Sequence, residues 1–75
     1  MASLPVISGR EAGRAFAKLG FAYDHHRGSH MLYYHPSGRH LSVPGHGELD
    51  RGTLRRLTQD AGITVEEFLR LLDDP

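Results

Sequence analysis

The spacing of hydrophobic positions predicts a helix close to the start of the chain. Ser8 and Glu11 have the spacing of a capping box, in which each side chain accepts a hydrogen bond from the other residue's backbone. Hydrophobic residues then recur at helical intervals, at Ala12, Ala15, Phe16 and Leu19. Gly20 follows and can take the left-handed conformation that often ends a helix. We therefore expect a first helix between Ser8 and Gly20.

A period of two replaces the helical period in the next part of the chain and predicts three strands. They cover residues 21–25, 31–35 and 40–43. In the first strand, simple alternation would put Phe21, Tyr23 and His25 on one face. The second and third strands are separated by Pro-Ser-Gly, which is typical turn chemistry. Three strands in hairpin order predict an antiparallel sheet.

Helical spacing returns in the last third of the chain. Asp50 offers an N-cap, and Gly62 can close the helix that follows. Between them, one hydrophobic face is formed by Leu54, Leu57 and Ala61. A second capping box, Thr-Val-Glu-Glu at 64–67, precedes a short last helix that carries Phe68, Leu71 and Leu72.

This order of elements predicts an α+β fold in one domain over residues 1–75. A three-stranded antiparallel sheet should have its helices on one face and leave the other face available, in the order α-β-β-β-α plus a short C-terminal helix. This is the architecture of double-stranded-RNA-binding domains. Of the three tyrosines, we expect two in the core, because aromatic residues in short strands usually pack against neighbouring strands.

The composition indicates the cellular compartment in which the protein is expected. The 75 residues include no cysteine, which excludes disulfides and thiolate metal sites and fits a reducing cytoplasm. The chain has no basic, apolar leader and no stretch near the ~20 apolar residues of a membrane span. We expect a cytoplasmic protein that does not contact membranes.

The formal net charge is zero, but the charges are unevenly distributed. Residues 1–59 carry eight of the nine basic side chains and only four of the nine acidic ones. Arg51, Arg55 and Arg56 fall at the start of the second predicted helix, where free backbone N–H groups also favour an anion. Guanidinium groups bind phosphate with two nitrogens at once. Binding of a nucleic acid and a merely solvated basic face are both compatible with this pattern.

Six histidines raise the question of a metal site. Imidazole suits zinc and nickel, and several of the six could in principle meet: His25, His26, His35, His40 and His46. None has the helical spacing of H-E-x-x-H, and no cysteine or acidic cluster completes a closed site. We therefore expect no metal and no cofactor.

Several short motifs, taken in order, resemble one known family. They are A-F-A-K-L-G-F at 15–21, G-S-H at 28–30, H-P-S-G-R at 35–39, V-P-G-H at 43–46, G-T-L-R-R-L at 52–57 and D-A-G-I-T-V-E-E-F-L at 60–69. Their order and spacing resemble the HicA (YcfA-like) toxins over nearly the whole chain. Where many relatives have a second histidine after G-S-H, this chain has Met31.

The resemblance implies the toxin of a type II toxin–antitoxin pair, an mRNA interferase with a fold like that of double-stranded-RNA-binding domains. It implies an endoribonuclease that needs no metal, is monomeric when alone, and is neutralised by a HicB-like antitoxin that covers the active site. The catalytic histidine that it implies is the one in G-S-H, His30.

Histidine suits RNA cleavage because its reference pKa of about 6.5 makes both protonation states available near neutrality. Arg27 and the three arginines of the second helix would hold RNA phosphates, Gly28 would let the RNA backbone approach, and Ser29 could donate to a phosphate oxygen. An ordinary hairpin turn explains Gly28 and Ser29 equally well. A second catalytic group could come from His46, His35 or His25.

Two other functions remain open at this level. A domain of the same shape could bind duplex RNA without cutting it, or could serve only as an interaction domain for another protein. Cleavage of RNA in the absence of metal would distinguish an endoribonuclease from these two alternatives.

Overall fold

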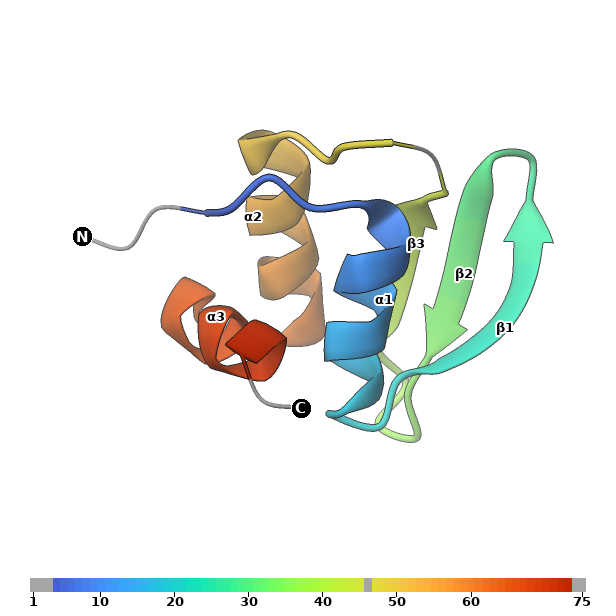
Figure 1. Ribbon diagram of the computed structural model, residues 1–75. Helices are drawn as coiled ribbons and strands as arrows, with labels where there is room; N and C mark the ends of the chain where they lie inside the picture. Colours follow the sequence, from blue (N-terminus) through green and yellow to red (C-terminus); the bar gives the residue numbers. More distant parts are fainter. Residues whose placement is uncertain (1–3, 46, 74–75) are drawn as a thin grey trace.

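The computed structural model describes residues 4–45 and 47–73, and its elements follow the predicted order (Figure 1). One helix, three strands and two further helices make an α+β fold. None of the helices within these two ranges is long and apolar enough to cross a membrane. The elements are α1 (Gly9–Ala17), β1 (Ala22–Arg27), β2 (His30–Tyr34), β3 (His40–Pro44), α2 (Arg51–Ala61) and α3 (Val65–Asp73).

Both predicted capping boxes are present. Before α1, the Glu11 amide donates to Ser8 Oγ, and the Ser8 amide donates to the Glu11 carboxylate, both at 3.1 Å. Before α3, the Thr64 amide donates to the Glu67 carboxylate at 3.0 Å, and the Glu67 amide donates to Thr64 Oγ1 at 3.1 Å. These bonds satisfy backbone donors that the first turn of a helix leaves free.

The ends of α2 are also as predicted. It begins directly after Asp50, whose side chain accepts from the Thr53 amide at 2.7 Å. It ends at Gly62, which has a left-handed conformation with φ 77°. The first helix is shorter than predicted, because α1 ends at Ala17 and single turns continue the chain to Gly20.

The strands form an antiparallel sheet in the order β1-β2-β3. β2 pairs with β3 in unbroken register, beginning with His30 opposite Pro44. The pairing of β1 with β2 contains a β-bulge between Tyr23 and His25. Side chains directly opposite each other lie on the same face of a sheet, so this register shows which residues share a face.

The bulge corrects the predicted faces of β1. Tyr23 pairs with Tyr33, whose side chain is buried on the helix side, whereas His25 pairs with Leu32 on the opposite side. The prediction that Tyr23 and His25 share a face is wrong, because the extra residue in the bulge turns the following residues over by one position. Arg27 is turned over with them.

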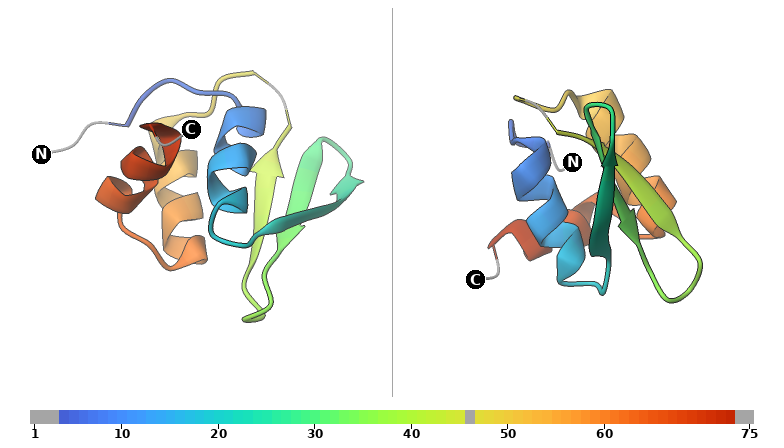
Figure 2. Two further views of the ribbon diagram at one scale, coloured as in Figure 1. Left: turned by 60° about the horizontal axis from the view of Figure 1, so that its bottom comes forward. Right: turned by 90° about the vertical axis from the view of Figure 1, so that its right-hand side faces the viewer.

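The helices lie together on one side of the molecule (Figures 1 and 2). Both figures show α1 and α2 near β3, with β1 at the opposite edge of the sheet and its start close to the end of α1. Every residue of β1 is exposed, whereas burial alternates along the other two strands. The buried positions of β2 and β3 are Met31, Tyr33, Leu41 and Val43. The alternate positions form an open face of the sheet.

The centre of the core joins α1 to α3. The Phe16 ring of α1 lies 6.2 Å from the Phe21 ring and 5.0 Å from the Phe68 ring of α3, centroid to centroid, and all three rings are buried. The Lys18 ammonium adds a hydrogen bond of 2.5 Å to the carbonyl of Leu71. The last helix is therefore part of the core.

The tyrosines differ from the prediction. Only Tyr33 is buried, and this burial raises the pKa of its phenol. Tyr23 is 50% exposed and Tyr34 is 44% exposed, so the expectation of two core tyrosines is wrong. Tyr23 lies on the helix side of β1, whose residues are all exposed, and Tyr34 lies on the open face.

Candidate active site

A two-residue turn formed by Gly28 and Ser29 joins β1 to β2. Gly28 has a φ of 60° and Ser29 does not have a positive φ, which is the pattern of a type II′ turn with glycine first. A Cβ on Gly28 would meet nothing within 4 Å, so the backbone conformation is what favours glycine here. The Ser29 carbonyl accepts from the Gly45 amide at 2.7 Å, which fixes the turn against the end of β3.

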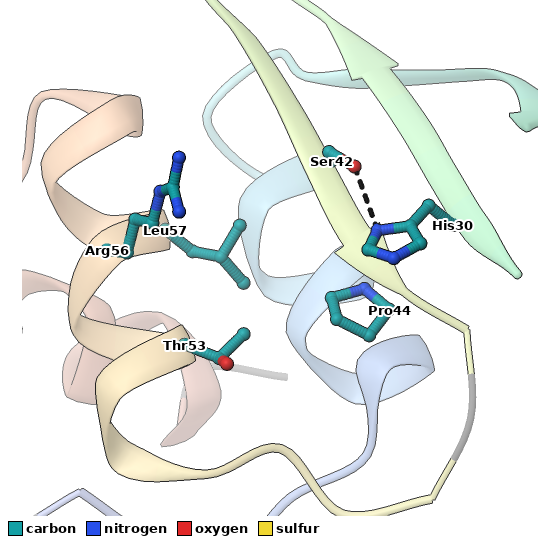
Figure 3. Close-up of a pocket in the computed structure, with 6 residues that line it drawn as sticks. All are labelled: His30, Ser42, Pro44, Thr53, Arg56 and Leu57. Carbon is teal, nitrogen blue, oxygen red and sulfur yellow. Dashed lines mark hydrogen bonds between the residues drawn. The ribbon is translucent and has the colours of Figure 1, made fainter.

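His30 is the first residue of β2 and its side chain is exposed on the open face. Its Nδ1 is 3.0 Å from the hydroxyl oxygen of Ser42. Ser42 lies on β3, two residues before Pro44, the residue that pairs with His30. This hydrogen bond orients the ring, and the other ring nitrogen, Nε2, points away from Ser42 (Figure 3). Among the residues that the structure describes, none bonds to Nε2, so it is available to a substrate.

A groove of about 310 Å³ adjoins His30 and separates the open face from α2. Figure 3 shows its two walls, one from the adjoining ends of β2 and β3 and the other from the first half of α2. The groove is lined by His30, Ser42, Pro44, Thr53, Arg56 and Leu57. It thus combines an imidazole, a guanidinium and two hydroxyl groups, which can together take up a proton, hold a negative charge and donate hydrogen bonds.

The four predicted phosphate-binding arginines are not equivalent. Arg56 lines the groove, and Arg27 pairs with His30 across the first hairpin, so both belong to the surface around His30. Arg51 and Arg55 are exposed on α2 but do not line the groove. The structure therefore places Arg27 and Arg56 at the surface around the histidine, whereas Arg51 and Arg55 lie on α2 outside the groove.

The N-terminus of α2 already has an anion of its own. The Asp50 carboxylate accepts the hydrogen bond from the Thr53 amide, and this bond lowers the pKa of the carboxyl group below its ordinary value. The expectation that free N–H groups at this end would attract an RNA phosphate loses its support, since a capping carboxylate occupies the position and repels a second negative charge.

Of the other histidines proposed as catalytic partners, the two that the structure describes, His35 and His25, do not line the groove. His35 has a structural role: its Nδ1 accepts from the Ser37 amide at 3.0 Å, so its Nε2 carries the proton and donates to the Leu19 carbonyl at 3.0 Å. His25 bonds to Asp24 through Nδ1 at 2.5 Å. His46 lies outside the described residues.

Over the described ranges, no three histidine or acidic side chains are grouped as metal ligands would be. The groove residues that sequence reasoning missed are Ser42, Pro44, Thr53 and Leu57. Ser42 could have been found, because it alternates with the core residues Leu41 and Val43 and must face the same way as His30. The others depend on how α2 packs beside β3.

A protein-family model described as HicA toxin of bacterial toxin–antitoxin matches residues 9–63. The chain belongs to the HicA toxin family. The match runs from the first residue of α1 past the end of α2, so it includes every residue of the groove in this HicA toxin and ends before α3. A comparison with curated proteins found no match. Membership of the family assigns the chain to a toxin–antitoxin pair and implies an antitoxin partner.

Proposed function

We propose that this HicA toxin is an endoribonuclease that cleaves messenger RNA in the cytoplasm without a metal ion, with His30 as its catalytic residue and residues 1–75 acting as one domain. The observation that carries the proposal is the groove in which His30 and Arg56 take part together. Family membership supports the same conclusion, since a toxin needs a target in its own cell.

The chemistry starts from the substrate's own 2′-hydroxyl. Nε2 of His30 takes the proton from this hydroxyl, O2′ forms a bond to the adjacent phosphorus, and the bond from phosphorus to O5′ breaks. The leaving O5′ takes a proton from water, which has access to the open groove. The products are a 2′,3′-cyclic phosphate and a 5′-hydroxyl. The Ser42 hydroxyl keeps the imidazole in one orientation through Nδ1.

The arginines stabilise the negative charge that develops on the phosphate. Arg56 acts from the α2 wall of the groove and Arg27 from the strand beside His30. Arg51 and Arg55 hold more distant phosphates of the same strand. Gly28 and Ser29 keep the hairpin narrow enough for the RNA backbone to pass, with the Ser29 hydroxyl as a further donor.

A HicB-like antitoxin would silence this site by covering the groove. Its contact surface should be acidic, because residues 1–59 hold eight of the nine basic side chains of the toxin. The toxin alone is expected to be a monomer that binds RNA through the same surface.

A cleavage assay in EDTA tests the proposal. Purified toxin and a long RNA should yield fragments that end in a 2′,3′-cyclic phosphate, and His30→Ala should abolish cleavage. The thermal stability of this variant should change little, because His30 is exposed. His26→Ala is the matched control, since His26 is an exposed histidine on the helix side of β1.

Three outcomes would contradict the proposal. Binding of RNA by the wild-type toxin without any cleavage would support the non-catalytic module instead. Cleavage by a folded His30→Ala variant would assign the reaction to another residue, with His46 the next to test. A large loss of stability in this variant would show that His30 is structural.

A further inference from the structure

Three aromatic rings cross the open face of the sheet in a single row. His25 of β1, Tyr34 of β2 and His40 of β3 each contribute one ring. The centroids of His25 and Tyr34 are 6.5 Å apart with 17° between the ring planes, and those of Tyr34 and His40 are 5.9 Å apart with 29°. Both pairs are stacked, so the row extends from one edge of the sheet to the other. We call these three residues the aromatic row.

The bulge in β1 is what completes the aromatic row. Without it, His25 would follow Tyr23 to the helix side, and only two rings would remain on the open face. With it, His25 and Arg27 lie on the same face as His30. Bulges are frequent beside functional sites, where they redirect side chains.

The aromatic row and the catalytic histidine belong to one continuous surface. Tyr34 and His30 are four residues apart on β2, which corresponds to about 13 Å along a strand. Both lie on the open face of the sheet, and Ser42 lies between them on β3 and bonds to His30. A few nucleotides of an extended strand can bridge this distance.

The chemistry of this surface favours a nucleobase over a protein side chain. The His25 and His40 rings each offer the π-face that is turned away from Tyr34, all three rings have a polar edge, and Arg27 supplies a positive charge on the same face of the sheet. The only carboxylate in β1, that of Asp24, is engaged by His25. Aromatic rings on a sheet with nearby cations are typical of surfaces that bind unpaired bases. Bases inside a duplex are already stacked and cannot reach such a row.

We propose that the aromatic row of His25, Tyr34 and His40 binds unpaired bases beside the cleaved phosphate, which makes single-stranded RNA the substrate class of this toxin. The proposal rests on the proposed function only for the position of the phosphate at His30. Base stacking contributes to affinity for every sequence, because every base has a π-face. The toxin should therefore prefer unpaired segments over duplex without a strict sequence requirement at these bases.

The test measures binding to RNA that cannot be cleaved. The probe is a mixed-sequence single-stranded 2′-O-methyl oligoribonucleotide that contains 2-aminopurine, whose fluorescence is quenched by stacking. The same oligonucleotide annealed to its complement is the duplex probe. Tyr34→Leu should weaken single-strand binding about tenfold, remove the quenching and leave the salt dependence unchanged, since stacking involves no counterion release. Duplex affinity should not change.

Three further variants sharpen the result. Tyr34→Phe keeps the ring and should bind like the wild type. His40→Ala shortens the aromatic row and should weaken binding, so it tests the proposal even if Tyr34→Leu fails to fold. Tyr23→Leu is the matched control, because Tyr23 is 50% exposed, close to the 44% of Tyr34, but lies on the opposite face. It should leave binding unchanged.

Other results overturn the proposal. If both Tyr34→Leu and His40→Ala bind RNA with wild-type affinity, the aromatic row takes no part in RNA binding. If the affinity falls equally for single strand and duplex, the row also contacts duplex RNA and does not select unpaired bases. Loss of antitoxin binding with RNA affinity unchanged makes the row a protein interface. Cleavage of unmodified RNA by the wild-type toxin is measured separately, so failure of the nuclease proposal leaves the binding result readable.

Discussion

A Cβ on Gly9 would lie 1.9 Å from the carbonyl oxygen of Pro44. The first residue of α1 therefore packs directly against the last residue of β3, with no space for a side chain. Pro44 also lines the groove beside His30, so this contact determines the position of one wall of the candidate active site. An isolated antiparallel β-bridge between Ser8 and Glu48 also holds the backbone of the residue that precedes α1.

Gly9→Ala should destabilise the toxin by about 1–3 kcal/mol, because the added methyl group can be accommodated only by moving backbone. The free energy of unfolding in urea measures this. Gly52→Ala is the control. Its Cβ would be in ordinary contact with the Asp50 carboxylate at 3.4 Å, and replacing glycine by alanine within a helix should raise the free energy of unfolding by about 0.5–1 kcal/mol. Equal stability of Gly9→Ala and the wild type would show that the two segments are farther apart in solution.

His35→Ala should lower the free energy of unfolding by about 2–3 kcal/mol, since three hydrogen bonds at about 1 kcal/mol each are lost. The bonds join the ring to the Ser37 amide, to the Ser37 hydroxyl and to the Leu19 carbonyl. Packing of the ring on Phe21, with centroids 4.8 Å apart, is lost as well. RNA cleavage, measured well below the melting temperature, should be unchanged. A stable but inactive variant would instead make His35 the second catalytic group.

Arg56→Gln should reduce RNA cleavage and lower the slope of log affinity against log salt by nearly one unit, as expected for one lost phosphate contact. Arg55→Gln should have a smaller effect on cleavage. The two residues are adjacent on α2 and point about 100° apart, and only Arg56 lines the groove. Equal losses of activity in both variants would contradict the assignment of Arg56 to the reacting phosphate.

Asp50→Asn should change how stability depends on acidity. The pKa of the Asp50 carboxyl is lowered from 3.8 in the folded protein, chiefly by the hydrogen bond from the Thr53 backbone amide. The charged form therefore stabilises the fold above the unfolded pKa, and this contribution is lost as the pH falls through the folded pKa. The wild type should be more stable than the variant at neutral pH. Urea midpoints should converge in acid; a constant difference would refute the prediction.

Features that depend on neighbouring residues could be predicted from the sequence. Both capping boxes, the Asp50 cap and the Gly62 cap are formed by residues within a few positions of each other, and all are found where the spacing predicts them. The element order follows from the same local patterns. The tight turn at Gly28 and Ser29 also follows, although the strand after it begins at His30, one residue before the predicted start at residue 31.

Features that depend on pairing between distant segments could not be predicted from the sequence. Alternation assigns Tyr23 and His25 to one face, but a bulge is visible only once β1 is paired with β2. In the same way, Arg55 and Arg56 are equal candidates until α2 is placed beside β3. The exposure of Tyr34 depends on which face the helices cover, and the sequence of one strand does not contain that information.

The packing of α3 has a consequence for how the toxin is made. Phe68 is fully buried against Phe16, so the hydrophobic face of α1 has no complete cover until residue 68 has left the ribosome. Residues 9–63, which include the whole groove, are synthesised before that point. A nascent chain should therefore hold His30 in an unfinished domain until residue 68 has emerged, and toxicity should begin only after that point.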